Sequence, residues 1–282
     1  MKDLQGKTAL VTGGATGIGK ALARELAQAG MTVTIASTNA GRLDAAAAEL
    51  RGDGLEIFPA VCDVADRDAV EALARALEAR HGPLDLLCAN AGVTTFGPFV
   101  DHRSGDWDWV TDVVFKGVAN CVQAFYPGMV ARKSGHIMLT GSQTALAPDW
   151  VLQHGPYIAA KAAVHALAFS LRPEAAEHGV GVTLFVPAAT ETDVEKGQRS
   201  RQQRYGEALQ GEVKLRADAP PPLADYPFFL SAEDAAARAI QGIRDNAAIV
   251  VTHAGMKPLV ADWFDRVLAA YDAAAAFPDR AS

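Results

Sequence analysis

Two side chains of opposite acid–base character stand four residues apart in the segment "GPYIAAKAAV" at 155–164. Residues i and i+4 of a helix share a face, so the phenol of Tyr157 and the ammonium of Lys161 point to one place. A cation within a few ångströms favours the phenolate and lowers a tyrosine pKa from about 10 by roughly one to three units. The pair therefore indicates a general acid/base that acts near neutral pH. The alternative is a tyrosine at the edge of the core and a lysine that extends to solvent.

A glycine-rich turn, "TGGATGIG" at 12–19, follows a strand-like segment and opens a helix-like one. Gly13 permits a sharp turn, Gly17 a close approach of a ligand to the backbone, and Gly19 close packing of the helix on the strand. Free amides at such a helix start suit a pyrophosphate. The turn predicts a nucleotide site, and the alternative is a purely structural turn.

Strand-like and helix-like segments alternate along the first two thirds of the chain. Short apolar segments rich in β-branched residues lie at 7–12, 31–36, 55–61, 84–90, 135–141 and 180–186. Helical spacing marks the segments 17–29, 40–51, 66–81, 106–131 and 155–178. This alternation predicts an α/β domain with a parallel sheet that is covered by helices on both faces.

The alternation stops near residue 190. Residues 191–230 are polar and have no clear period, which favours an active-site lid or a disordered loop. A helix at 232–245, a strand at 248–252 and an amphipathic helix at 257–274 follow, and we expect the last helix to pack on the body rather than on a membrane. Basic side chains in 195–216 could recognise an anionic substrate, but a solvated helix of mixed charge is the preferred interpretation. They are Lys196, Arg199, Arg201, Arg204, Lys214 and Arg216.

Composition limits the kinds of partner. The 282 residues carry a net charge of −7, so the chain has no general attraction for nucleic acid or for an anionic membrane. Three separated cysteines, Cys62, Cys88 and Cys121, favour a reducing, cytoplasmic setting. The histidines show no metal-ligand spacing, so no metal site is expected. We recognise no leader peptide, and no apolar run approaches the ~20 residues of a membrane span.

The spacing T-G-x-x-x-G-x-G resembles that of the short-chain dehydrogenase/reductase family, and other family motifs follow in order. They are "CDV" at 62–64, "NAG" at 90–92, Ser142 after the fifth strand, the pair Tyr157 and Lys161, and "VPAAT" at 186–190. The resemblance covers about 5–190, and 232–252 more loosely. It implies one doubly wound, Rossmann-like domain over 1–282, with a seven-stranded mainly parallel sheet, a lid at 191–230 and a C-terminal helix.

The resemblance also implies an activity. The chain would be an NAD(P)-dependent oxidoreductase that transfers a hydride between nicotinamide and a secondary alcohol or carbonyl compound. Ser142 would bind the substrate oxygen, Tyr157 would exchange its proton, and Lys161 would hold the nicotinamide ribose. The long helices 106–131 and 155–178 imply a homodimer or homotetramer.

For the cofactor, the resemblance implies adenine contacts from Asp63 and Val64, a ribose-side contact from Asn90, and a carboxamide contact from Thr192. Taken singly, Asp63 could be a helix cap, Asn90 a turn residue and Thr192 a loop residue. The complete implied set is Thr12, Gly13, Thr16, Gly17, Ile18, Gly19, Ser37, Thr38, Asp63, Val64, Asn90, Ala91, Gly92, Tyr157, Lys161, Pro187 and Thr192.

Two positions depart from the family pattern. Val114 stands where the family has an asparagine that takes part in a water relay to the active-site lysine, and Ala188 replaces a common glycine. We expect the helix opening at Val114 to persist and the relay to be weakened. Because of Val114, the second interpretation is a non-catalytic dinucleotide-binding protein of the same fold, redox-sensing or scaffolding, and a dehydratase or epimerase is the third.

The second strand ends in Ser37 and Thr38, without an acid to bind a ribose 2′-hydroxyl. Arg42 follows one helical turn later, so we expect NADP to be preferred over NAD. Trp150 and "FFL" at 228–230 favour an apolar small-molecule substrate. Trp150, Leu152 and His154 are expected at the substrate mouth, with His154 as a polar wall residue rather than a catalyst.

Overall fold

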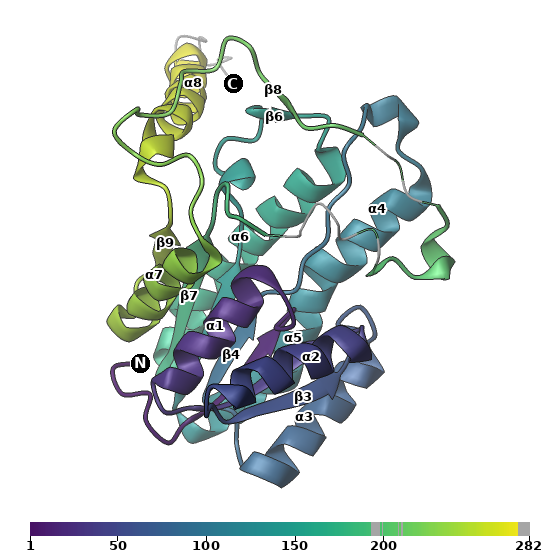
Figure 1. Cartoon of the computed structure of the whole chain (residues 1–282). Coiled ribbons are helices and arrows are strands. Elements are labelled where there is room, and N and C mark those ends of the chain that lie inside the picture. Colours follow the sequence, from purple (N-terminus) through teal and green to yellow (C-terminus); the bar gives the residue numbers. More distant parts are fainter. Residues whose placement is uncertain (193–197, 199, 208, 210, 276–282) are drawn as a thin grey trace, which may run out of the picture.

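The computed structural model describes residues 1–192, 198, 200–207, 209 and 211–275. Seven strands form one sheet in the order β3-β2-β1-β4-β5-β7-β9, and all neighbouring strands are parallel (Figure 1). Their bounds are β1 Thr8–Thr12, β2 Thr32–Ser37, β3 Ile57–Val61, β4 Leu86–Ala89, β5 Gly135–Thr140, β7 Val180–Val186 and β9 Ile249–Val251. The central strands are almost wholly buried, as expected of a sheet covered on both faces. The predicted doubly wound α/β fold is confirmed.

Helices cover both faces of the sheet (Figure 1). Residues of α1, α2 and α7 form one apolar core with the sheet, and residues of α3 to α6 form the other. The helices are α1 Gly17–Gln28, α2 Ala40–Gly52, α3 Arg67–His81, α4 Ser104–Thr111, α5 Gly117–Arg132, α6 Gly155–Glu177, α7 Ala232–Asp245 and α8 Lys257–Ala275. Short 3-10 turns lie at Phe99–Asp101, Gln143–Ala145, Gln203–Tyr205 and Ala254–Met256. Within the described residues, no helix combines the length and apolarity that a membrane crossing requires.

The segment 191–230 differs from its expected structure. A two-residue strand β8 (Lys214–Leu215) pairs antiparallel with β6 (Val151–Leu152), a small sheet that the sequence did not predict. The helix preferred for 195–216 is wrong, because the described residues form only a 3-10 turn and β8 there. Its described arginines are not free for an anionic substrate, because each pairs with a carboxylate. Lys196 and Arg199 lie outside the described residues.

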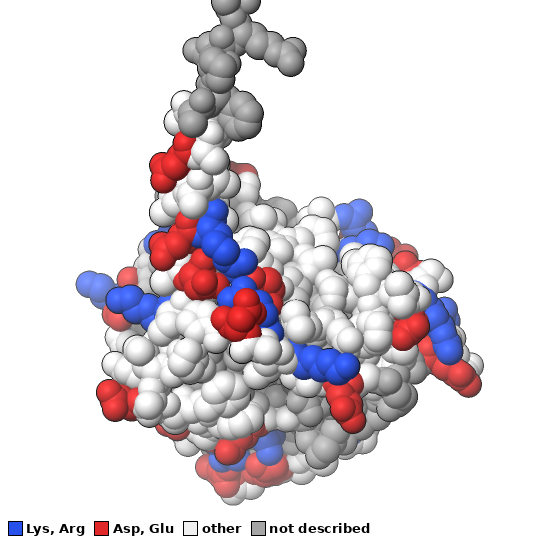
Figure 2. Space-filling view, turned by 90° about the horizontal axis from the view of Figure 1, so that it is seen from above, with Lys and Arg blue, Asp and Glu red and all other residues white. Residues whose placement is uncertain are grey.

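Helix α8 stands away from the body along most of its length (Figures 1 and 2). Of its apolar stripe only Leu259 is buried, whereas Phe264 is 47% and Tyr271 is 73% exposed. The packing on the body that was expected for this helix is therefore confined to its first half. Arg216 and Arg266 share the carboxylates of Asp149 and Asp262, and these ion pairs tie the first half of the helix to the small sheet.

The helix expected over 106–131 contains a change of pitch. A π-helical turn, η2 (Asp112–Lys116), separates α4 from α5, and the amide of Gly117 donates to the carbonyl of Asp112, five residues back. The π-helical turn includes Val114, whose side chain is fully buried, so the change of pitch occurs although the residue is valine. Gly117 lies against Val64: a β-carbon on Gly117 would be 2.6 Å from Val64 Cγ2.

Gly117→Ala should destabilise the protein although alanine is the better helix residue by about 1 kcal/mol. The added methyl would overlap Val64, and overpacking of a filled core costs about 1–3 kcal/mol. We expect a net loss on the order of 1 kcal/mol in the free energy of unfolding, measured by urea denaturation. Gly128→Ala is the matched control, because Gly128 is exposed on the same helix and should gain stability. A gain in both variants would contradict the packing argument.

Candidate functional site

A cavity of about 490 Å³ lies at the carboxyl ends of the central strands, where parallel α/β sheets bind their ligands. It extends from the glycine turn after β1, past the ends of β2 and β4, to Ser142 and Tyr157. Every predicted site residue lines it except Thr12, which is buried beneath it. Residues separated by more than 170 positions in the sequence are therefore brought to one cavity.

The glycine turn has the backbone geometry that its sequence requires. Gly13 and Gly17 have φ values of +67° and +50°, in the left-handed region that favours glycine. Gly19 is needed for a close approach, because a β-carbon there would lie 2.1 Å from the carbonyl oxygen of Gly13. Helix α1 begins at Gly17, so its first amides face the cavity, an arrangement suited to an anionic group.

Thr12 has a different role from the predicted one. Its hydroxyl accepts hydrogen bonds from the backbone amides of Asn90 at 2.9 Å and Ala91 at 3.0 Å. The Asn90 side chain donates in turn to the Thr12 carbonyl at 3.1 Å and accepts from the Thr140 hydroxyl at 3.2 Å. Thr12 thus positions the residues that line the cavity instead of lining it, a correction to the sequence assignment.

Helix α6 presents a row of functional side chains at four-residue intervals: Tyr157, Lys161 and His165. The Lys161 ammonium donates to the Thr140 carbonyl at 2.7 Å. His165 Nε2 accepts the backbone amide of Ser142 at 3.1 Å. Burial lowers the pKa of His165 to about 4, which keeps the ring neutral and able to accept this bond. His165 was missed from the sequence, although its spacing from Lys161 was a signal for it.

Burial dominates the acid–base properties of the pair on α6. It lowers the pKa of Lys161 to about 7 and raises the pKa of Tyr157 to about 12, and the Ser142 hydroxyl offsets the second shift only in part. The expectation that Lys161 lowers the pKa of Tyr157 is therefore wrong in this structure. At neutral pH the phenol keeps its proton and is set up as a proton donor, while Lys161 titrates close to neutrality.

Aromatic side chains surround the far end of the cavity. His154 stacks between Phe96, with ring centres 4.2 Å apart, and Tyr157, with ring centres 4.5 Å apart. Its Nε2 lies 2.5 Å from the Thr94 hydroxyl, and burial lowers its pKa to about 3. His154 is thus a neutral wall residue, as expected from the sequence. Trp150 also lines the cavity, but Leu152 is 40% exposed and does not.

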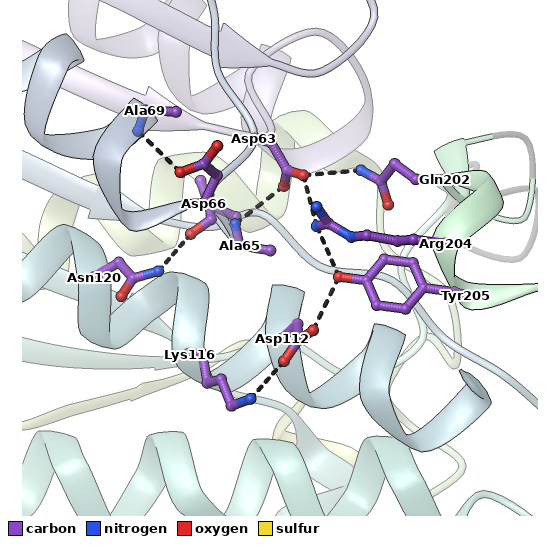
Figure 3. Close-up of polar contacts among 11 residues, drawn as sticks. Asp63, Ala65, Asp66, Ala69, Asp112, Lys116, Asn120, Gln202, Arg204 and Tyr205 are labelled. Atoms are coloured by element: carbon purple, nitrogen blue, oxygen red, sulfur yellow. Dashed lines mark hydrogen bonds and ion pairs between the residues drawn. The ribbon is translucent and has the colours of Figure 1, made fainter. Parts of the chain in front are cut away.

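At the other end, Asp63 is held by several donors (Figure 3). One carboxylate oxygen accepts the Ala65 amide at 3.0 Å, and the other accepts the Gln202 amide at 3.1 Å and the Arg204 guanidinium at 3.0 Å. Arg42 lines the cavity beside Ser37 and Thr38 and donates to the Ser200 hydroxyl at 2.8 Å. The contacts from Ser200, Gln202 and Arg204 were not predicted.

Comparison with known proteins identifies the family of the chain. The family model described as short chain dehydrogenase matches residues 7–203. The C alpha-dehydrogenase of Sphingobium sp. strain SYK-6 is 32% identical over 255 residues, which cover 90% of this chain and 82% of that protein.

Two solved structures extend the comparison. A short-chain dehydrogenase/reductase from Burkholderia phymatum in complex with NAD has a TM-score of 0.84 at 28% identity, covering 95% of this chain and 96% of that one. A metagenomic short-chain oxidoreductase in complex with NADP has a TM-score of 0.62 at 34% identity, covering 66% and 83%. Since the matched residues include both the glycine turn and the group formed by Ser142, Tyr157 and Lys161, the chain belongs to the short-chain dehydrogenase family of oxidoreductases.

Proposed function

We propose that this protein is an NAD(P)-dependent enzyme that interconverts a secondary alcohol and a carbonyl group on an apolar small molecule. The observation that carries the proposal is the single cavity that joins the glycine turn to Ser142, Tyr157 and Lys161. The similarity to proteins solved with NAD and with NADP supports a nicotinamide dinucleotide as the cofactor.

The residues of the cavity fit such a cofactor. The backbone of the glycine turn would hold the pyrophosphate, Asp63 the adenine, and Lys161 the nicotinamide ribose. Thr192 lies over the turn, with its Cβ 3.1 Å from where a β-carbon on Gly17 would be, so a larger residue at Gly17 would crowd the cradle. When bound, the nicotinamide supplies or accepts the hydride.

The chain's own residues handle the substrate oxygen and its proton. Ser142 is held by the His165 ring and by a 2.9 Å contact between its hydroxyl and that of Thr144. It would bind the substrate oxygen, and Tyr157 would give it a proton in the reducing direction. In the oxidising direction Tyr157 needs a proton acceptor, and Lys161, with its pKa near 7, is the neighbouring group that can relay the proton.

The substrate end has an apolar wall, and two of its buried polar atoms have no partner among the described residues. Trp150 and Phe228 contact each other edge to face, and Phe229 and Leu215 complete the apolar wall. Gln143 Nε2 and His154 Nδ1 are buried there without a hydrogen-bond partner among the described residues. Buried polar atoms of this kind favour a substrate that is mainly apolar and carries an additional polar group.

The non-catalytic alternative rested on Val114. A π-helical turn includes this residue without the family asparagine, and such turns are frequent at functional sites, which supports a relay that is retained. We therefore propose an active enzyme with a weakened relay. The homodimer or homotetramer expected from the long helices stays a prediction.

Tyr157→Phe should lower turnover by at least about 10², the low end for general acid–base catalysis. Turnover would be measured with the best substrate of a panel of ketones and secondary alcohols. Cofactor affinity, measured by nucleotide fluorescence, should change little. Tyr126→Phe is the control, because Tyr126 lies on α5 and contacts Glu174, away from the cavity. Full turnover in the Tyr157 variant would remove this residue from the mechanism.

Lys161 should make stability depend on pH in a defined direction. Its pKa is about 7 in the folded protein and about 10.4 when unfolded, so between these values the unfolded chain binds the extra proton. The free energy of unfolding should therefore rise with pH, by at most about 1.4 kcal/mol per unit. Lys161→Met lacks this contribution. The free energy of unfolding of the parent, measured by urea denaturation, should therefore increase relative to that of the variant from pH 7 to pH 9. The exposed Lys257→Met variant should show no such trend, and parallel curves for Lys161→Met would contradict the lowered pKa.

NADPH should bind more tightly than NADH, because Arg42 and two hydroxyls, rather than an acid, face the end of β2. Arg42→Ala should lose on the order of tenfold in NADPH affinity, the size of one charge-assisted hydrogen bond. NADH affinity is the internal control and should stay nearly constant. Equal affinity for the two cofactors in the parent, or tighter NADH binding, would defeat the preference.

A further inference from the structure

We propose that Gln202 and Arg204 form a latch that closes the adenine end of the cavity, so that the cofactor enters and leaves only while the latch is open. The inference rests on the proposed cofactor function. It concerns the described residues 200–207, here called the latch segment.

The latch segment reaches the cavity at a carboxylate that the cofactor would also use. Gln202 and Arg204 both donate to one oxygen of Asp63 (Figure 3). Asp63, Ser200 and Gln202 all line the cavity. With the Ala65 amide on its other oxygen, Asp63 already accepts three of the roughly four hydrogen bonds that a carboxylate can accept. A ligand bound at Asp63 would therefore compete with the latch segment for the same carboxylate.

The segment is firmly anchored on one side. Arg201 donates to Asp106 at 2.7 Å, and the two side chains are only 4% and 0% exposed. The buried Tyr205 donates its hydroxyl to Asp112 at 3.0 Å, at the start of the π-helical turn. Gly105 makes this docking possible, because a β-carbon there would lie 2.1 Å from the Tyr205 carbonyl oxygen. These contacts hold the segment on α4.

The contact with Asp63 is weaker than the anchor. The Arg204 side chain is 50% exposed and that of Asp63 is 21% exposed, so water screens their attraction. Breaking a half-exposed ion pair is far easier than breaking the buried pair of Arg201 and Asp106. The segment should consequently open at Asp63 while it stays attached to α4.

The test is the rate of cofactor exchange, measured by stopped-flow fluorescence with NADPH and NADH. Arg204→Ala should speed both association and dissociation by about two- to fivefold, the size expected from one exposed ion pair. The double variant Gln202→Ala/Arg204→Ala should reach about tenfold. Because both rates rise, affinity should change less than either rate. Arg204→Lys keeps the positive charge, so its association and dissociation rates should lie between those of Arg204→Ala and the parent. In 0.5 M salt the difference in rates between the parent and Arg204→Ala should become smaller.

Gln203→Ala is the matched control, because Gln203 lies in the same 3-10 turn and is exposed. Rates in the latch variants equal to those of this control would overturn the proposal. A parent that binds neither nucleotide would refute the cofactor function. A parent that binds the nucleotides, with exchange rates that Arg204→Ala and the double variant leave unchanged, would refute the latch itself.

Discussion

The side chain of Asn90 joins the carboxyl ends of three parallel strands, and the whole site is built on this junction. Its amide donates to the last carbonyl of β1, and its carbonyl oxygen accepts from the last hydroxyl of β5. At these positions the parallel ladder ends and backbone groups need other partners. The same residue of β5, Thr140, accepts the Lys161 ammonium. One amide side chain thus fixes the glycine turn relative to the lysine of α6.

Around this junction, burial disfavours the charged form of each titratable side chain. It shifts the pKa values of Tyr157, Lys161, His154 and His165 toward the neutral form of each group. In so dry an environment hydrogen bonds are electrostatically stronger than in water, and an unpaired ion is costly. At neutral pH the cavity therefore acts through position and hydrogen bonding more than through net charge.

The sequence predicted what depends on local pattern. The buried strands, the glycine turn and the i, i+4 pair on α6 each arise from neighbouring residues, and each was found at its expected place. Contacts between distant segments were not predictable in this way. Arg201 and Asp106 are 95 positions apart, and nothing near either residue indicates the other. The burial that raises the pKa of Tyr157 depends on side chains from several segments, so spacing alone gave the wrong sign.

The edges of the seven-stranded sheet have a consequence for how copies of this chain behave beside one another. An exposed edge strand presents free backbone donors and acceptors to any other strand that approaches. At one edge, β3 contains Pro59, which has no N–H to donate and interrupts such a ladder at its centre. At the other edge, β9 has only three residues, Ile249–Val251. Neither edge strand can therefore pair well with a strand of another copy. Aggregation by pairing of sheet edges is disfavoured at both edges of the sheet.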